Sequence, residues 1–371
     1  MAQFVIARPG HLYLASYDAM TSSFTITYDL PFDGTPSWLT LHPNEPTIYV
    51  VDEDSSNLYR FHFDPSSATP FTRRDAVSNA SPGLVYLDFN KTATRLAGAA
   101  FSNSTMDVYD TEIGAFKKLD KHLVSSAKTG PVTHIQDAPH PHQILCDPTG
   151  RYFAVNDLGT DEILLIDSKD DAFNIVNRIV VEPAGSGPRH GAFYPAGGDV
   201  ASHYILLCEL SNTIVVYSLT YTADNIQFTQ TSSVSSFGPQ GPPVATARAG
   251  HFELLPDNRH VYISNRLTER ASDSIAHFRV VHEGEHPTLE FISEVPTNGI
   301  LPRMFCVMDK GTGDVVATNE KSDWGITIFG RDPKTGVLEN KPKLSVPMTE
   351  FMSDEEKKAK PNNGPKFVLH V

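Results

Sequence analysis

The stretch Pro141-His142-Gln143-Ile144-Leu145-Cys146-Asp147-Pro148 decides the fold, because degenerate copies of it recur along the chain. Each copy opens a short strand-like run, and most are followed by two further runs rich in Val, Ile, Tyr and Phe. Successive copies begin 46 to 63 residues apart, at Pro36, Pro82, Pro141, Pro188, Ala249, Pro302 and Pro365. A repeat of this length, with short strands separated by Gly and Pro turns, is typical of four-stranded propeller blades.

The two ends of the chain complete this pattern. The N-terminal segment supplies two strand-like runs, 11–17 and 23–28, with no opener before them, whereas the C-terminal segment 366–371 is an opener with nothing after it. If the last strand joins the first runs, the ring closes and no sheet edge stays exposed. The sequence therefore predicts an all-β fold: a seven-bladed β-propeller, with residues 1–371 as a single domain and the ring closed by the C-terminal strand joining the N-terminal blade. The alternative of two β-sandwiches or separate β domains would need a linker of shifted composition, which the chain does not show.

Helix signals are confined to one segment, 353–360, which opens with the capping-box pair Ser353 and Glu356. The charged run inside it is interpreted as a solvated turn before the closing strand.

Charge and cysteine content limit the partners and the compartment. The 44 Asp and Glu residues against 30 Lys and Arg give a net charge of −14, which argues against a nucleic acid or a membrane surface as partner. The three cysteines lie in apolar strand-like runs and are predicted to be reduced core residues. No secretory signal and no apolar run of about 18 residues is visible, so a cytoplasmic location is expected. The sequence is compatible with a homo-oligomer.

Two rows of residues are predicted to ring one mouth of the central channel, because neighbouring antiparallel strands start and end at the same face. The first row follows each opener and comprises Ser37, Gly83, His142, Arg189, Gly250, Arg303 and Lys366. The second row ends each second strand and comprises Tyr17, Glu53, Phe101, Asp157, Glu209, Arg266 and Glu320.

Cations gathered at one mouth of an acidic protein predict a site for a small anion, a polycarboxylate or a phosphate. Arg303, Lys366, His190 and His251 are expected to contribute to binding. Glu209 and His142 form a candidate proton-transfer pair. Burial would raise the pKa of Glu209 and nearby arginines would lower it, and the sequence leaves the outcome open.

Simpler interpretations exist for each of these residues. Arg189 and Arg266 could pair with turn acids such as Asp157 or Glu320, as surface arginines commonly do. His140, His142, His190 and His251 lack the spacing of a metal site, so no metal and no cofactor is predicted. The chain also lacks a phosphate-binding glycine loop and a Gly-x-Ser-x-Gly elbow.

The motif set resembles that of the seven-bladed propeller lactonase family over nearly the whole chain. The resemblance rests on 139–143 (Pro-His-Pro-His-Gln), 156–161 (Asn-Asp-Leu-Gly-Thr-Asp), 187–190 (Gly-Pro-Arg-His), 208–212 (Cys-Glu-Leu-Ser-Asn) and 263–266 (Ile-Ser-Asn-Arg). Within that family, the motifs are more similar to those of fungal 3-carboxy-cis,cis-muconate lactonising enzymes than to those of bacterial-type 6-phosphogluconolactonases. The resemblance places the catalytic set on His142, Arg189, Glu209 and Arg266.

The resemblance implies a cofactor-free cycloisomerase that converts 3-carboxy-cis,cis-muconate to its lactone in aromatic catabolism, with Arg189 and Arg266 stabilising the developing charge. Glu209 would supply the proton while His142 positions the substrate. The alternatives are hydrolysis of a sugar lactone on the same scaffold, and a propeller that only binds protein partners. The loop 267–271 is longer than the family pattern and also carries Arg270, but we expect Arg266 to face the substrate because it directly ends a strand.

Overall fold

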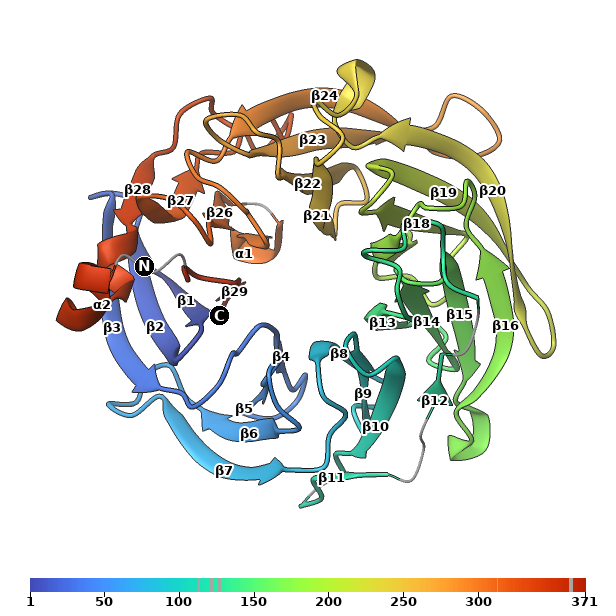
Figure 1. Cartoon of the computed structure of the whole chain (residues 1–371), viewed down its shortest axis with the longest axis horizontal. Coiled ribbons are helices and arrows are strands. Elements are labelled where there is room, and N and C mark those ends of the chain that lie inside the picture. Colours follow the sequence, from blue (N-terminus) through green and yellow to red (C-terminus); the bar gives the residue numbers. More distant parts are fainter. Residues whose placement is uncertain (113, 120–122, 126–127, 312, 360–362) are drawn as a thin grey trace.

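Seven antiparallel sheets surround one central axis in the computed structural model of the chain, as Figure 1 shows. The structure describes all of the 371 residues except 113, 120–122, 126–127, 312 and 360–362. We number the sheets as blades 1 to 7 in chain order and give the strands of each from the innermost outward. The prediction of an all-β, seven-bladed propeller is thereby confirmed.

The first four blades have the following strands. Blade 1 contains β29 (Phe367–His370), β1 (Ala2–Arg8), β2 (His11–Asp18) and β3 (Ser23–Pro31). Blade 2 contains β4 (Leu39–Leu41), β5 (Thr47–Val51), β6 (Leu58–Phe63) and β7 (Phe71–Val77). Blade 3 contains β8 (Leu84–Phe89), β9 (Arg95–Ala100), β10 (Thr105–Asp110) and two short outer strands, β11 (Lys117–Lys118) and β12 (Leu123–Val124). Blade 4 contains β13 (Pro141–Cys146), β14 (Tyr152–Asp157), β15 (Glu162–Asp167) and β16 (Asn174–Val180).

The remaining three blades repeat the arrangement. Blade 5 contains β17 (Pro188–Tyr194), β18 (His203–Cys208), β19 (Thr213–Tyr221) and β20 (Ile226–Ser235). Blade 6 contains β21 (Arg248–Leu254), β22 (His260–Arg266), β23 (Ser274–Val281) and β24 (Thr288–Pro296). Blade 7 contains β25 (Phe305–Val307), β26 (Val315–Thr318), β27 (Trp324–Phe329) and β28 (Leu344–Pro347). The described helices are α1 (Met308–Gly311), α2 (Asp354–Ala359) and the 3-10 turns Lys169–Asp171, Gly238–Gln240 and Met348–Phe351.

The C-terminal strand closes the ring as predicted. β29 pairs with β1 in antiparallel register, with Phe4 opposite His370 and Ala7 opposite Phe367. Both termini therefore belong to the same blade, with the C-terminal strand innermost and the N-terminal strand next to it (Figure 1).

The assignment of strands within blade 1 was wrong in one respect. The second strand is β1, so the predicted runs 11–17 and 23–28 are the third and fourth strands. The residue that ends the second strand is consequently Arg8 rather than Tyr17. The run Phe4–Ala7 is fully buried, and such a strand lacks the alternation that marks a half-exposed one.

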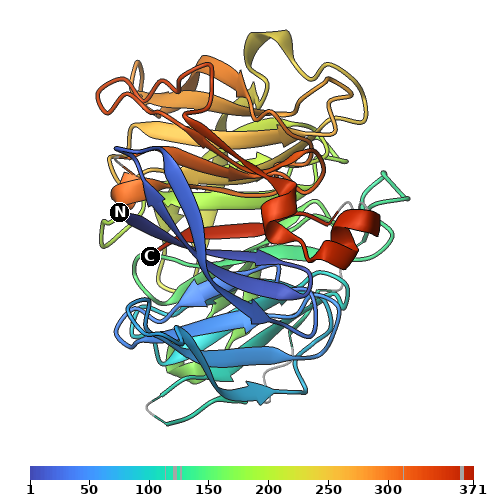
Figure 2. The same cartoon turned by 90° about the vertical axis from the view of Figure 1, so that its left-hand side faces the viewer.

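The hydrophobic core lies between neighbouring blades, which stack face to face in the side view of Figure 2. The second strands are buried on both faces, as in β5 and β18, where every residue is buried. Outer strands alternate instead between half-buried and exposed positions, as in β16. One cluster joins Val5 of blade 1 to Ile48 and Phe61 of blade 2, so burial of apolar surface holds adjacent blades together.

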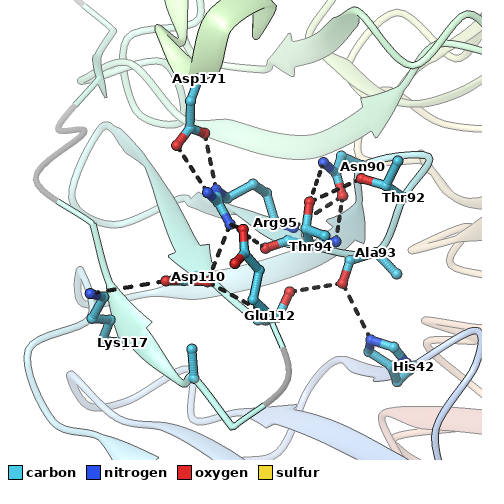
Figure 3. Close-up of polar contacts among 12 residues, drawn as sticks. His42, Asn90, Thr92, Ala93, Thr94, Arg95, Asp110, Glu112, Lys117 and Asp171 are labelled. Atoms are coloured by element: carbon cyan, nitrogen blue, oxygen red, sulfur yellow. Dashed lines mark hydrogen bonds and ion pairs between the residues drawn. The ribbon is translucent and has the colours of Figure 1, made fainter.

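Polar contacts also link blades at their outer parts (Figure 3). The guanidinium of Arg95 in blade 3 donates from Nε and Nη2 to Asp171 of blade 4, at 3.0 and 3.1 Å. His42 of blade 2 contacts the carbonyl oxygen of Ala93 in blade 3 at 3.3 Å. These contacts fix the angular position of blade 3 between its two neighbours.

Helix α2 lies within the predicted segment 353–360, of which residue 360 lies outside the described residues. Its capping box is present: Ser353 N donates to Glu356 Oε2 at 2.8 Å, and Glu356 N donates to Ser353 Oγ at 3.2 Å. Glu356 also binds Arg8 of β1, so part of this charged run is paired rather than solvated. In the described part of the chain, no helix has the length and apolar character needed to cross a membrane.

Candidate functional site

A β-bulge directs His142 toward the mouth of the central channel. In β13, Pro141 pairs with Asp157 and Gln143 pairs with Asn156, so His142 is an extra residue between two consecutive pairs. A bulged residue is released from the ladder and its side chain is re-aimed. The opener that decided the fold therefore places its histidine at the channel.

The same device recurs in three other innermost strands. In β17 the register shifts around Arg189, and in β8 it shifts around Val85. In β21 the shift spans Gly250 and His251. Four of the seven innermost strands therefore have a bulge at or near the predicted first-row position. In blade 3 the residue at the mouth is Val85, not Gly83, because β8 begins at Leu84, two residues after the opener Pro82, and its bulge is at Val85.

The re-aimed side chains line two adjoining spaces. An outer cavity of about 160 Å³ is lined by Glu53, Val85, Phe101, Ile135, His142, Leu158, Arg189, Glu209, Arg266 and Arg303. A deep pocket of about 10 Å³ is lined by Ser37, Trp38, Val85, His142, Arg189, His190, His251, Arg303, Met304 and Lys366. Four residues belong to both linings, so the deep pocket lies directly below the outer cavity. The structure brings all eight predicted site residues to these two spaces.

Ion pairs organise the polar side of the outer cavity. The Glu209 carboxylate bridges two arginines: Arg189 Nε lies 2.7 Å from its Oε2, and Arg266 Nη2 lies 2.9 Å from its Oε1. Arg303 Nη2 lies 3.0 Å from Glu53 Oε2. Four lining cations, including Lys366, thus face two carboxylates, which leaves an excess of two positive charges. The arginines pair with these acids rather than with Asp157 or Glu320.

The charged groups keep their ordinary ionisation states. Burial on its own would raise the pKa of Glu209, but the charges of Arg266 and Arg189 outweigh it, and the pKa lies below its usual value. Glu209 is therefore a carboxylate at neutral pH and a poor proton donor. Burial and the charge of Arg266 lower the pKa of Arg189 to about 9, which leaves the guanidinium protonated at neutral pH.

His142 is neutral in this environment. Burial lowers its pKa well below the usual value, and the positive charges of Arg189, Arg303 and Arg266 lower it further. Its Nδ1 is buried and has no hydrogen-bond partner among the described residues. An uncharged imidazole that lines the cavity can act as a general base toward a molecule bound there.

Several neighbouring residues have structural roles. Asp157 accepts hydrogen bonds from the backbone N–H groups of His140 and Gly159, at 2.8 and 3.0 Å, and so holds the turn beside the mouth. The His140 ring stacks on Phe101 at 4.2 Å between centroids; its Nε2 lies 2.8 Å from Asp137 Oδ1 and its Nδ1 lies 2.9 Å from the carbonyl oxygen of Phe101. Its ring nitrogens are therefore occupied.

Arg270 points away from the cavity. It lies on the loop after β22 and its Nη1 is 3.6 Å from Glu294 Oε2 on β24, with a side chain that is 45% exposed. Arg266 lines the cavity with a side chain that is 14% exposed, so of these two arginines it is the one at the cavity.

An apolar wall faces the cations, and the sequence analysis missed most of it. Phe101 was placed in the second row, but Val85, Ile135 and Leu158 were not identified. Ile135 and Leu158 come from loops and carry no repeat signal. Val85 lies two residues beyond Gly83, the position that the repeat predicts.

Hydrogen bonds occupy lone pairs that a metal would need. His190 Nε2 lies 3.2 Å from Arg189 Nη1, and His190 Nδ1 lies 3.2 Å from His251 Nδ1. Among the residues that the structure describes, no group of three or more His, Cys, Asp and Glu side chains is arranged to hold a metal ion.

Fold and site together define a seven-bladed propeller with a positively charged cavity at one mouth of its channel. Residues 3–353 match the family model described as "Lactonase, 7-bladed beta-propeller", and the chain belongs to this family.

Named relatives support the family. The chain is 29% identical over 340 residues to a protein named "Probable 6-phosphogluconolactonase" from Arthroderma benhamiae, covering 90% of this chain and 83% of the relative. It is 28% identical over 320 residues to the 6-phosphogluconolactonase of Bacillus subtilis, covering 85% of each protein. These names support the lactonase family and not the muconate-type assignment within it.

Solved structures show the same fold. A periplasmic gluconolactonase from Pseudomonas aeruginosa superposes with a TM-score of 0.81 at 21% identity, covering 100% of this chain and 99% of that one. A protein from Lactobacillus plantarum superposes with a TM-score of 0.77 at 22% identity, covering 100% of both chains.

Proposed function

We propose that the protein hydrolyses the lactone of a small anionic sugar acid at the mouth of the channel. One observation carries the proposal: the neutral imidazole of His142 lines a cavity that holds an excess of positive charge. The names of the 6-phosphogluconolactonase relatives support the same reaction class.

The reaction follows from these groups. His142 accepts a proton from water as the water oxygen attacks the lactone carbonyl carbon. Negative charge then develops on the carbonyl oxygen, where preorganised arginines such as Arg189 and Arg303 stabilise it. The ring C–O bond breaks, and the departing ring oxygen takes the proton from the imidazolium to give the open hydroxy acid.

Glu209 acts on this reaction through the arginines. Its carboxylate fixes Arg189 and Arg266 in place, at 2.7 and 2.9 Å, and stays ionised. The remaining charge of the cavity binds the anionic group of the substrate.

The test is lactone hydrolysis above the spontaneous rate, measured with 6-phosphogluconolactone and with gluconolactone. We expect His142→Gln to lower kcat/KM by about 10²- to 10⁴-fold, the range of general acid-base catalysis. His134→Gln is the matched control, because His134 is exposed and lines neither space. Wild-type rates in the His142 variant would refute the role of this residue.

The apolar wall favours a second candidate, the cyclisation of 3-carboxy-cis,cis-muconate. A sugar lactone carries hydroxyl groups on most of its ring carbons, whereas Val85, Phe101, Ile135 and Leu158 offer only apolar contact. A flat unsaturated polycarboxylate would place its diene on this wall and its carboxylates on the arginines. Metal-independent loss of the diene's ultraviolet absorbance on adding the protein would support this candidate. If neither substrate is converted, a non-catalytic binding role is left.

A further inference from the structure

Three imidazoles and a tryptophan surround the deep pocket. The ring centroids of His142 and His190 are 5.1 Å apart, and those of His190 and His251 are 5.2 Å apart. The indole of Trp38 lies against the same histidines, 6.1 Å from His190 and 6.4 Å from His251. All four side chains line the pocket, and the three histidines are each less than a tenth exposed.

The hydrogen-bond chain assigns the proton positions on two of these rings. A guanidinium only donates, so His190 Nε2, 3.2 Å from Arg189 Nη1, is an acceptor without a proton. Burial lowers the pKa of His190 well below its usual value, so the ring is neutral and its single proton is on Nδ1.

The assignment then passes to His251. His190 Nδ1 donates to His251 Nδ1 across 3.2 Å, which makes that nitrogen an acceptor. Burial and the charge of Arg189 lower the pKa of His251 to about 3, so this ring is neutral as well and carries its proton on Nε2. No described residue accepts a hydrogen bond from this N–H. Arg189 therefore sets the tautomers of two histidines in series.

The polar groups of the deep pocket are consequently almost all donors. His251 offers an N–H, Lys366 an ammonium and Arg303 a guanidinium, and none of the three can accept a hydrogen bond in this state. The volume of about 10 Å³ admits roughly one oxygen-sized atom. A ligand that lies in the outer cavity can reach into it with one atom.

We propose that the deep pocket is a subsite for one negatively charged oxygen of the ligand, from a carboxylate or a phosphate, and that His251 is the residue that donates to it. Arg189 and His190 are positioning residues, because they fix the tautomer that turns His251 into a donor. The subsite rests on the proposed function for the identity of the ligand, whereas the tautomers can be tested without a substrate.

The first experiment determines the tautomers in the ligand-free protein by ¹⁵N NMR of histidine-labelled full-length chain near neutral pH. Single variants of His142, His190 and His251 assign the signals. We expect His190 to carry its proton on Nδ1, the less common tautomer, and His251 to carry it on Nε2. In Arg189→Met, the signal of His190 should shift to a mixture of tautomers. A His190 proton on Nε2, or an imidazolium at either position, would overturn the assignment.

The second experiment measures binding through Trp38. Trp324 is the other of the two tryptophans and lies on β27, so Trp324→Phe leaves one reporter in the pocket. Acetate and inorganic phosphate are titrated separately, which distinguishes a carboxylate from a phosphate subsite. We expect at least one of them to change the Trp38 emission.

Two substitutions of His251 then test whether anion binding requires its N–H donor or only an aromatic ring at this position. His251→Phe should weaken the binding by about 10- to 100-fold, as expected for the loss of a hydrogen bond to a charged group. His251→Gln keeps an N–H near the position of Nε2 and should stay within about threefold of the parent protein. His11→Phe, in blade 1 and outside both linings, is the control. Unchanged binding in His251→Phe, or no response to either anion in the parent, would refute the subsite even if lactonase activity were found.

Discussion

The Arg189 guanidinium and the Glu209 carboxylate are 2.7 Å apart, with side chains that are 2% and 14% exposed. Both belong to blade 5, on β17 and directly after β18, and Arg266 of blade 6 binds the other oxygen of the same carboxylate. The Glu209 carboxylate therefore joins blades 5 and 6 at the cavity through Arg266.

Glu209→Gln should destabilise the protein, because it leaves the buried Arg189 and the half-buried Arg266 without their counter-charge. Breaking a buried ion pair from one side typically costs about 3–5 kcal/mol of unfolding free energy. Phosphate should recover part of the loss by binding the unpaired arginines. Urea unfolding with and without phosphate measures both effects.

The control for this variant is Glu290→Gln. Glu290 pairs with Arg279 on the outer strands of blade 6, and both side chains are nearly half exposed. Exposed pairs contribute about 0–1 kcal/mol, so little change is expected there. Equal stability losses in the two variants would contradict the special position of Glu209.

Arg266 and Arg270 should differ sharply in their effect on activity. Arg266→Ala removes a cation that lines the cavity, and we expect a loss of about 100-fold or more in kcat/KM, as for loss of a charge-stabilising group. Arg270→Ala removes only a half-exposed pair with Glu294 and should leave kcat/KM near the wild-type value. Steady-state kinetics with whichever lactone the protein hydrolyses measures both variants. A larger loss of kcat/KM in Arg270→Ala than in Arg266→Ala would place the substrate on the loop.

Much of this site follows from the sequence because the repeat fixes where each innermost strand begins. The opener prolines locate His142 and Arg189, and the ends of the second strands locate Glu209 and Arg266. Other positions depend on register, which is set by pairing between strands and not by the strand itself. The displacement from Gly83 to Val85 is of this kind.

The sequence repeat could not predict two further features of the structure. The buried run of β1 has neither an opener nor alternation, so blade 1 was assigned one strand too late. The apolar wall includes Ile135 and Leu158, and loop residues are brought to the cavity by contacts between distant segments. The bridging of two arginines by Glu209 likewise depends on the three-dimensional approach of blades 5 and 6.

The pH dependence of kcat/KM should report His142. A general base must be unprotonated, so activity falls as the pH drops through its pKa, which burial and three arginines hold well below the usual value. We expect kcat/KM to stay flat down to a pH below about 6.5, the ordinary pKa of histidine. Arg303→Met removes one of these charges and should move the acid limb to higher pH. If kcat/KM of the wild-type protein fell with an apparent pKa above about 6.5, His142 would be excluded as the base.

Glu253 should make the stability pH-dependent. Burial raises its pKa from 4.5 to about 8, so the folded state keeps a proton that the unfolded state releases at lower pH. The unfolded state then binds fewer protons between these values, and stability falls as the pH rises through this window. Glu253→Gln should therefore gain melting temperature relative to wild type as the pH rises from about 5 to about 8. The exposed Glu283→Gln is the control, and a parallel pH profile for Glu253→Gln and wild type would contradict the prediction.

Ring closure should depend on Phe367. This side chain lies on β29, is 1% exposed and packs in the core cluster of blades 1 and 2. Phe367→Ala should cost about 3–5 kcal/mol of unfolding free energy, the usual range for a buried Phe. Val180→Ala on the outer strand of blade 4, with 60% exposure, should change little. Denaturant unfolding of both variants tests whether the C-terminal strand carries this energy.

The bulges at the mouth separate the chemistry of this protein from its architecture. A residue such as Val85, His142 or Arg189 has no partner in the ladder of its own strand, so its replacement leaves the pairing of the blade intact. Such side chains can thus be exchanged one at a time during evolution without a change in the strand pairing that defines the blade. The fold of the propeller therefore places little restriction on which residues, and hence which reaction, occupy the mouth of the channel.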